Sequence, residues 1–255
     1  MSLDFDSARL PNKNLTPEHH EWRAQLRRFI DREIMPYAED WDENGSIPDE
    51  LWTKSAEIGL LGMGYPEEFG GVTEGIDMWH SIIVNEELAR VAVGGVAATL
   101  LVHGIGLPPV INFGSDEIKQ RVAPPVLAGT KRISLAITEP GGGSDVAQLQ
   151  TTARLDGDHY IVNGSKTYIT GGMNANWFTT AVRTGGEGSV GVSTLLIPSD
   201  AEGVSRTALD RKQGWWCSDT ATIYFDNVRV PVGNLLGQEN KGFAVIMNNF
   251  NSERL

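Results

Sequence analysis

The strongest constraint on the fold is a change in hydrophobic spacing near residue 132. Upstream, apolar residues such as Trp22, Leu26 and Phe29 recur at the three- to four-residue spacing of a helix face. Downstream, over residues 133–138, apolar and polar side chains alternate, which is the spacing of a strand. From Gly242 onward the helical spacing returns.

These three regions of different hydrophobic spacing predict an α+β chain. Residues 1–131 form an all-helical N-terminal domain, and residues 132–237 form a small domain of mostly antiparallel strands, an antiparallel β-barrel or a sandwich. Residues 238–255 begin a C-terminal helical domain whose remainder is missing, because the chain stops at Leu255 with no capping residue. The apolar face of this last helix needs a cover, which we expect from further chain or from another chain.

Local signals predict where several elements begin and end. Thr16 before Pro17 starts a helix, and residues 77–93 continue the helical pattern. An Ala- and Gly-rich helix runs on to about Phe113, and Ser115 caps the next helix, which Pro124 and Pro125 limit.

In the second half, turn residues separate the strand candidates. Three pairs are predicted as turns: Asp156-Gly157, Asn163-Gly164 and Gly185-Gly186. Within the last strand candidate, residues 220–230, Ala221, Ile223 and Phe225 face one side and Thr222 and Tyr224 face the other.

Charge and cysteine content exclude several classes of protein. The formal net charge of −12 argues against a duplex-binding protein, whose phosphate contacts require clustered cations. The single cysteine, Cys217, excludes an internal disulfide, and no His, Asp or Glu cluster has metal-site spacing. No segment is typical of a membrane span or a secretory signal, so we predict a cytoplasmic protein that binds no metal.

The segment from Ile137 to Asp145 carries the first chemical signal. It reads Ile-Thr-Glu-Pro-Gly-Gly-Gly-Ser-Asp, a strand end followed by three glycines and a serine. Glycines let the backbone approach a ligand and turn its N–H groups toward an anion, so the segment predicts a phosphate or pyrophosphate cradle. A plain glycine-rich hairpin loop is an equal alternative on this segment alone.

A second segment, residues 163–172, predicts a strand that places Tyr168 and Thr170 on one face. An aromatic face beside a hydroxyl donor suits a planar heteroaromatic ring. By itself, however, this segment is also typical of an ordinary strand.

Together with five further motifs, the two segments resemble the acyl-CoA dehydrogenases, a family of flavoproteins. The resemblance also includes the following segments: Pro66 to Gly71, Ser218 to Ala221, Phe225 to Pro231, Asn234 to Gly237 and Lys241 to Phe243. It implies FAD as cofactor and the oxidation of an acyl-CoA thioester to the trans-2-enoyl-CoA. It further implies an electron-transfer flavoprotein as electron acceptor, and a homo-oligomer, usually a tetramer.

The resemblance also assigns residues to the cofactor. Leu135 to Ser144 would wrap the edge of the flavin, with Thr138 bonded to its ring and Ser144 near the pyrophosphate and the thioester. Tyr168 stands where relatives often carry Trp, and Thr170 would bond near the reactive flavin nitrogen. The full set of cofactor residues is Leu135, Ile137, Thr138, Gly143, Ser144, Tyr168, Ile169 and Thr170.

The catalytic base implied by the resemblance is Glu253. Most members keep this carboxylate later in the C-terminal bundle, but isovaleryl- and long-chain-type enzymes place it on the helix that begins here. Asn251 and Arg254 would then lie on the substrate side with Ser144, and Arg254 would help to position the CoA portion. The alternative for Glu253 is a solvated helix residue.

Two functional hypotheses therefore stand side by side. The first is an FAD-dependent acyl-CoA dehydrogenase, of which this chain alone could be inactive. The second is a catalytically inactive flavin- or CoA-binding module, or a scaffold, whose site another chain completes. Outside these motifs, we expect His103 in the core, Cys217 as a packed small residue, and Trp215-Trp216 over the flavin, at a subunit contact or in the core.

Overall fold

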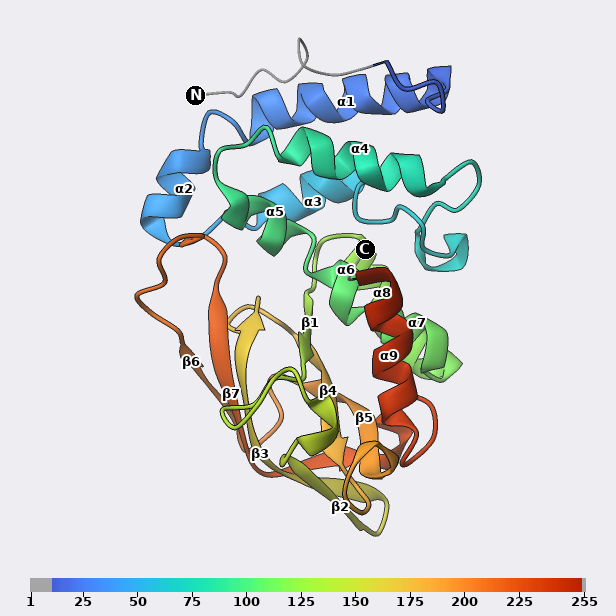
Figure 1. Ribbon diagram of the computed structural model, residues 1–255, viewed down its shortest axis with the longest axis vertical. Helices are drawn as coiled ribbons and strands as arrows, with labels where there is room; N and C mark the ends of the chain where they lie inside the picture. Colours follow the sequence, from blue (N-terminus) through green and yellow to red (C-terminus); the bar gives the residue numbers. More distant parts are fainter. Residues whose placement is uncertain (1–10, 254–255) are drawn as a thin grey trace. The chain divides into compact units, whose positions relative to one another are not determined.

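The computed structural model describes residues 11–253, with side chains described to residue 250, and it divides into two compact units (Figure 1). One unit combines Met1–Leu100 with Lys212–Ser218, and the other combines Leu101–Arg211 with Asp219–Leu255. The domain boundaries predicted at residues 131 and 237 stay predictions.

The first unit is helical. Its described elements are α1 (Pro17–Glu33), α2 (Ala38–Asn44), α3 (Glu50–Glu57), a 3-10 turn (Glu67–Phe69), α4 (Met78–Leu88) and α5 (Gly94–Leu100). Helix α1 begins at the predicted residue, because the Thr16 hydroxyl accepts from the His19 amide while the His19 ring accepts from the Thr16 amide. Helix α2 covers the acidic run 38–44, which the sequence pattern did not predict as a helix.

Helices α1 and α4 pack through a buried apolar seam and a buried ionic cluster. The seam includes Leu26 and Ile30 from α1 and Ile83 from α4, all fully buried. The carboxylate of Glu87 in α4 is fully buried, and both its oxygens accept from Arg27 at 2.9 Å. Arg23 and Arg90 also contact Glu87. Helix α4 ends at Leu88 rather than at the predicted Val93, because β-branched residues and glycines follow it.

The helices of the second unit correct two predictions. The continuous helix to Phe113 is wrong, since α6 (His103–Gly106) and α7 (Pro108–Phe113) are separate and Pro108 starts a new helix. Helix α8 (Asp116–Leu127) is capped by Ser115 as predicted, but it passes Pro124 and Pro125. Proline lacks only its N–H, so the Pro124 carbonyl still accepts from Ala128 and completes the final turn.

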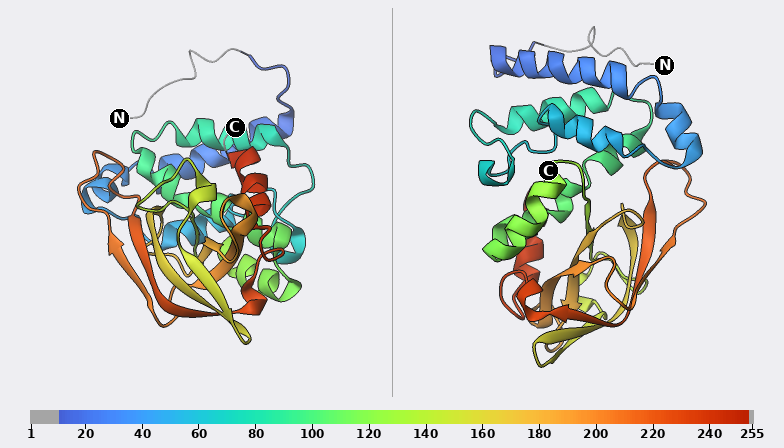
Figure 2. Two further views of the ribbon diagram at one scale, coloured as in Figure 1. Left: turned by 60° about the horizontal axis from the view of Figure 1, so that its bottom comes forward. Right: turned by 180° about the vertical axis from the view of Figure 1, so that it is seen from behind.

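The remaining elements of this unit form a curled mixed sheet, a half-barrel flanked by helix α9 (Gly242–Glu253), seen from two further sides in Figure 2. The strands are β1 (Ile133–Ala136), β2 (Thr152–Asp156), β3 (His159–Thr170), β4 (Trp177–Arg183), β5 (Val192–Pro198), β6 (Val204–Ala208) and β7 (Thr220–Pro231). The short 3-10 turns are Val146–Gln148, Ser189–Gly191 and Val232–Asn234. The spatial order is β1-β4-β2-β3-β7-β6, with β5 paired to β4.

This sheet confirms the predicted fold class and refines the strand directions. Strand β1 pairs with β4 in parallel, as β2 does at one position, whereas the other pairs are antiparallel. The strands are therefore mostly antiparallel, as predicted, and the parallel β1–β4 pair makes the sheet mixed. Alternation in β7 is confirmed, since Ala221, Ile223 and Phe225 are buried and Tyr224 is exposed.

The predicted turn at Asn163-Gly164 is wrong, because β3 continues through it as a bulge. Gly164 adopts a φ of +144°, and a Cβ there would lie 2.7 Å from the Cα of Thr151. The glycine thus permits close approach of two backbones rather than chain reversal. The turn at Asp156-Gly157 is confirmed, since Gly157 and Asp158 join the paired residues Asp156 and His159.

Helix α9 finds part of its cover within this chain. Ile246 is buried with Ile137 and Leu149, and Phe243, Met247 and Phe250 pack against the same cluster. The side-chain amide of Asn249 donates to the Ile105 carbonyl at 3.1 Å. Part of the apolar face is therefore covered by Ile137, Leu149, Ala181 of β4 and Val192 of β5. Further cover from more chain or from another chain stays a prediction.

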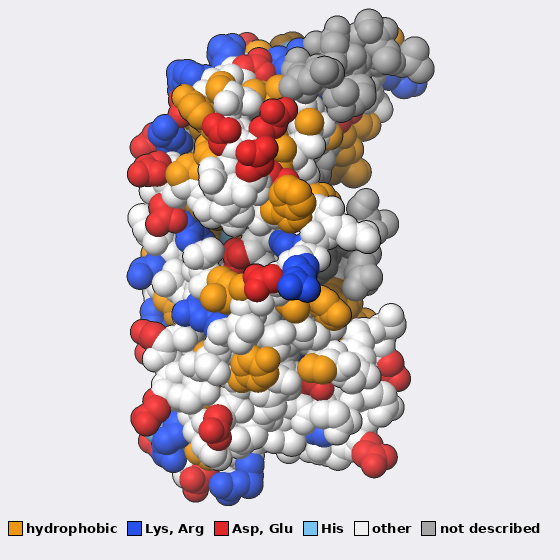
Figure 3. Space-filling model, turned by 90° about the vertical axis from the view of Figure 1, so that its left-hand side faces the viewer, with side chains coloured by type: hydrophobic (Ala, Val, Ile, Leu, Met, Phe, Trp, Pro, Cys, Tyr) orange, Lys and Arg blue, Asp and Glu red, His pale blue; other side chains and the backbone are white. Residues whose placement is uncertain are grey.

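The surface carries both signs of charge. Acidic and basic side chains are scattered over the face drawn in Figure 3. Among the described residues, no single helix is long and apolar enough to cross a membrane, although Gly94–Leu100 and His103–Phe113 together pass a test of length and composition.

The buried ionic cluster generates a stability prediction. We expect Glu87→Gln to lower the free energy of unfolding by about 3 kcal/mol, because the arginines lose the buried charge that compensates them. Urea unfolding followed by circular dichroism measures this difference. The neighbouring Glu86→Gln is the control, since that carboxylate is partly exposed and should cost less than about 1 kcal/mol. Equal effects at the two positions would contradict the assignment.

Candidate functional site

The structure brings the two predicted site segments together. The Thr167 amide, in β3, donates to the Thr138 carbonyl at 2.8 Å, just beyond the end of β1. One residue earlier, Lys166 Nζ donates to the Ile137 carbonyl at 3.1 Å. Thr138 and Tyr168 therefore lie on adjoining backbone, although 30 positions separate them in the sequence.

The glycine segment forms a closed turn beside Thr138. The Glu139 amide donates to the Gly142 carbonyl at 3.0 Å, and the Gly142 amide donates back to the Glu139 carbonyl at 3.1 Å. A Cβ at Gly143 would lie 3.2 Å from Cγ2 of Thr138, so the backbone passes close over that side chain. The segment is thus a tight hairpin turn closed by two backbone bonds, with exposed glycines at its tip.

A cavity of about 550 Å³ adjoins this turn. It is lined by Ile137, by residues 139–143 and by segments 145–146, 148–151 and 164–165. Of the predicted cofactor residues, only Ile137 and Gly143 line it. Thr138, Ser144, Tyr168 and Thr170 do not.

Tyr168 lies at a second irregularity of β3. Its φ is +58°, a left-handed conformation that is uncommon for a tyrosine, and 69% of its surface is exposed. Ile169 beside it is buried and Thr170 is half-buried. Beyond Thr170, the Gly171 amide donates to the Asp219 carbonyl and the Met173 amide donates to the Asp219 carboxylate at 2.7 Å. The strained aromatic is therefore held on both sides by ordered backbone.

The hydroxyl groups near Tyr168 are available to a ligand. Within the part of the chain that the structure describes, the side-chain hydroxyls of Thr138, Ser144 and Thr170 make no hydrogen bond to protein. An exposed aromatic face with nearby free donors fits a planar ring that has a hydrogen-bonding edge. The residues present thus fit the flavin that the sequence resemblance implies.

The predicted base lies at the limit of the described residues. Asn251 and Glu253 belong to the backbone of α9, but their side chains lie outside the described residues, as does the whole of Arg254. What the structure gives is the helix itself, whose Ile246 belongs to the same buried cluster as Ile137 of the predicted cofactor segment.

Sequence reasoning missed the buried pair that joins the segments. Lys166 is fully buried, and its Nζ donates to Glu139 Oε1 at 2.7 Å. Burial lowers the pKa of Lys166 to about 8. Burial also acts to raise the pKa of Glu139, but the Lys166 charge and the hydrogen bonds outweigh it and lower that pKa overall. No local pattern marks Lys166, because polar residues such as Ser165 and Thr167 flank it in β3.

A second cluster was also missed, because its members are far apart in the sequence. One donor atom each from His19, Asp77 and His80 lies within 4.8 Å of the others. Asp77 caps α4, and its Oδ1 lies 2.9 Å from His19 Nε2 and 3.0 Å from His80 Nδ1. The prediction that no such cluster exists rested on spacing along the chain and did not foresee this contact.

The hydrogen bonds of this cluster describe a helix cap. His19 Nδ1 accepts from the Thr16 amide at 3.0 Å, so we assign the ring proton to Nε2, which donates to Asp77. A metal would need the lone pair of that same nitrogen. Asp77 Oδ1 instead accepts from His19 Nε2 and from the Trp79 amide, both at 2.9 Å, and lies 3.0 Å from His80 Nδ1, which joins the first turns of α1 and α4.

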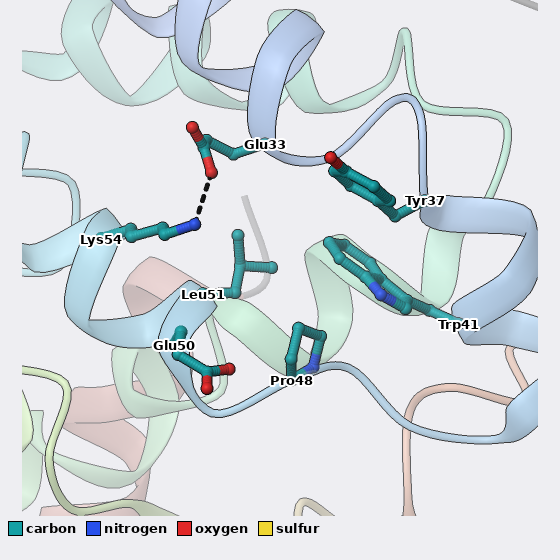
Figure 4. Close-up of a pocket in the computed structure, with 7 residues that line it drawn as sticks. All are labelled: Glu33, Tyr37, Trp41, Pro48, Glu50, Leu51 and Lys54. Carbon is teal, nitrogen blue, oxygen red and sulfur yellow. Dashed lines mark hydrogen bonds and ion pairs between the residues drawn. The ribbon is translucent and has the colours of Figure 1, made fainter.

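Other regions carry weaker candidates. A pocket of about 270 Å³ in the first unit lies between the stacked rings of Tyr37 and Trp41 and the Lys54–Glu33 ion pair (Figure 4). Its polar groups already pair with each other at an exposed position, which leaves little for a ligand.

Three single-residue expectations can now be compared with the structure. His103 is buried, as expected, and so is Cys217, whose thiol pKa burial raises to about 12. A core position for the tryptophan pair is wrong, since Trp215 and Trp216 are both exposed.

The Asp77 cap gives a pH-dependent prediction. Hydrogen bonds from His19, followed by those from His80 and Trp79, lower the pKa of Asp77 from 3.8 to about 2. A lowered folded-state pKa gives stability that is present above pH 3.8 and is lost as the pH falls toward 2. We therefore expect Asp77→Asn to lower the urea midpoint of unfolding at neutral pH. The difference between the midpoints of the variant and the wild type should disappear as the pH falls toward 2. Asp116→Asn controls for loss of a surface charge, and a gap that persists unchanged in acid would contradict the linkage.

The strain at Tyr168 gives a second prediction. We expect Tyr168→Gly to raise the free energy of unfolding of the ligand-free protein by about 0.5–1 kcal/mol, because glycine adopts a positive φ without strain. The matched control is Tyr224→Gly, at an exposed tyrosine of β7 with ordinary φ. This variant should lower the free energy of unfolding by about 1 kcal/mol. Thermal denaturation of both variants measures the contrast, and a loss of stability at both positions would argue against stored strain.

Comparison with known proteins agrees with this geometry. The N-terminal domain model of the acyl-CoA dehydrogenases matches residues 16–130, and the middle domain model matches residues 134–228. The chain is 37% identical to acyl-CoA dehydrogenase AFT10-1 of Alternaria alternata over 97% of its own length and 60% of that relative. It is 35% identical to the mitochondrial isobutyryl-CoA dehydrogenase of Dictyostelium discoideum over 96% and 58%. The chain thus spans about three fifths of the length of these curated relatives.

Solved structures agree as well. One described as a probable acyl-CoA dehydrogenase of Mycobacterium abscessus superimposes with a TM-score of 0.90 at 48% identity, covering 94% of this chain and 63% of that one. Another, the Bacillus anthracis acyl-CoA dehydrogenase complexed with FAD, gives 0.86 at 34% identity, covering 96% of this chain and 42% of that one. Given the matched domains, the fold and the joined segments, this chain belongs to the acyl-CoA dehydrogenase family.

Proposed function

We propose that this chain forms the FAD-binding part of an enzyme that oxidises an acyl-CoA thioester to the trans-2-enoyl-CoA. The observation that carries the proposal is the juxtaposition of Thr138 with the exposed, strained Tyr168, which Thr167 holds through its bond to the Thr138 carbonyl. Family membership supports the same conclusion, as does the FAD complex of the Bacillus anthracis relative.

The chain's own residues would hold the cofactor by distinct means. The hydroxyls of Thr138 and Thr170 would donate to the ring edge, and Tyr168 would cover one ring face. Leu135, Ile137 and Ile169 give apolar support, while Gly143 and Ser144 would meet the pyrophosphate. Tyrosine keeps the aromatic contact that tryptophan makes in many relatives, over a smaller area.

The same site would hold the thioester and remove its α-proton. We propose that the Glu253 carboxylate accepts that proton, while Ser144, Asn251 and Arg254 position the substrate. When bound, FAD supplies the acceptor for the hydride that leaves the β-carbon, so the Cα–Cβ single bond becomes a double bond. Residue 253 follows Ile246 by seven positions and Phe250 by three, a spacing that repeats on one helix face.

Partners follow from the chemistry. The hydride leaves the cofactor reduced, so each turnover requires an external electron acceptor, for which we propose an electron-transfer flavoprotein. We also propose a homo-oligomer, a dimer or tetramer, as the working assembly. The cytoplasmic location stays a prediction, and two of the relatives are named as mitochondrial enzymes.

The proposal is tested by reconstituting the longest product of this gene with FAD and titrating it with acyl-CoA thioesters without oxygen. Bleaching of the flavin absorbance by a saturated thioester, with release of the enoyl product, supports the dehydrogenase. A yellow protein that no thioester reduces would favour a binding module instead.

The base is tested by Glu253→Gln. We expect FAD binding and thioester binding to persist while the rate of flavin bleaching falls about 10²–10⁴-fold, because an amide cannot accept the α-proton. Stopped-flow absorbance measures the rate. The control is Glu239→Gln, at an exposed carboxylate outside α9. Unchanged bleaching in Glu253→Gln would move the role to another carboxylate.

A further inference from the structure

We propose that the buried Lys166–Glu139 ion pair is a positioning device, which locks the glycine turn and Thr138 into the conformation that binds the cofactor. The inference rests on the proposed function for the identity of the ligand. The role itself is argued from contacts among described residues.

Lys166 binds the end of β1 at two points. Its Nζ donates to the Ile137 carbonyl at 3.1 Å and to Glu139 Oε1 at 2.7 Å, on either side of Thr138. The backbone of the next residue, Thr167, donates to Thr138 itself at 2.8 Å. Three successive residues, 137 to 139, are therefore each bound from β3, and the Thr138 hydroxyl is left free to face a ligand.

Glu139 extends the lock to the start of β2. Its Oε2 accepts from the Gln150 amide at 2.5 Å, and its Oε1 also accepts from the Thr151 amide at 2.8 Å. The same residue closes the glycine turn through both of its backbone bonds with Gly142. One buried carboxylate thus fixes both stems of the loop that carries Gly141, Gly143 and Ser144.

Stability alone explains this pair poorly. Lys166 is fully buried and Glu139 nearly so, and removing two charges from water costs more free energy than most ion pairs recover. Apolar side chains of similar volume would fill the space without that cost, but they would leave the Gln150 and Thr151 amides without these acceptors. Apolar side chains could not replace the Lys166 ammonium, which donates to the Ile137 carbonyl and to Glu139, or the Glu139 carboxylate, which accepts from two amides. A preorganised ligand loop requires such bonds.

The pair also joins the two halves of the site. Lys166 lies two residues before Tyr168 on β3. The β3–β7 register that fixes the position of the Lys166 ammonium therefore also fixes the position of the bulge at which the Tyr168 ring is exposed. Loss of the pair should loosen the glycine turn relative to Tyr168 while the β3–β7 pairing remains.

The test uses Lys166→Met, Glu139→Gln and the double variant Lys166→Met/Glu139→Gln in the longest product of the gene. The single Lys166 variant leaves a buried unpaired carboxylate and is expected to lose thermal stability. The double variant removes both charges and should regain most of its melting temperature. If the pair positions the loop, the double variant should nevertheless bind FAD at least about tenfold more weakly than the wild type does, as measured by fluorescence quenching.

A second readout needs no cofactor. In the ligand-free protein, amide hydrogen exchange of Gly142, Gln150 and Thr151 should accelerate about tenfold or more in the double variant, while the amides of β7 stay protected. Val230→Ala, a core truncation in the same sheet at its far end, is the matched control. It should lower the melting temperature without changing loop exchange or FAD affinity.

Each outcome decides between the proposals. A double variant that binds FAD within twofold of wild type and keeps slow loop exchange overturns the positioning role and leaves the proposed function intact. The positioning role is also overturned if FAD affinity falls in proportion to the melting temperature in every variant, including Val230→Ala. If wild type binds no FAD, the proposed function fails, and the exchange experiment alone decides whether the pair orders the loop.

Discussion

A lysine with no exposed surface connects the two chain segments on which the candidate site depends. Lys166 in β3 donates to the Ile137 carbonyl and to Glu139 beyond the end of β1. Strands β1 and β3 are not ladder partners in the sheet order, so this ammonium and the single backbone bond from the Thr167 amide link the end of β1 to β3. Thr138 is a loop residue, and these bonds hold it beside β3.

The same link helps to hold Tyr168 in its strained backbone conformation. A tyrosine in the left-handed region is costly, and it persists only where the surrounding structure determines it. Here the Lys166 contacts precede it, and the Asp219 contacts with Gly171 and Met173 follow it. The sheet thus holds an exposed aromatic ring beside unpaired hydroxyls, an arrangement that favours ligand binding over packing.

Much of the architecture was predictable because it depends on local signals. The Thr16 and Ser115 caps, the alternation in β7 and the change from helix to strand all depend on neighbours within a few residues. Predictions failed where contacts distant in sequence decided the outcome. Asn163-Gly164 continues a strand because Thr151 lies against the glycine, and Pro124-Pro125 does not end α8 because the last carbonyls still find donors.

The sequence by itself determined the family, the helical and sheet segments, and the list of residues that could face a flavin, since motifs and periodicity are properties of short stretches. Only the tertiary structure decided that Lys166 and Glu139 form a buried pair, that His19, Asp77 and His80 converge on one helix cap, and that Ile246 of α9 shares a buried cluster with Ile137. These arrangements join residues tens to more than a hundred positions apart, and no local pattern fixes such a contact, because its free energy comes from burial that exists only in the folded chain.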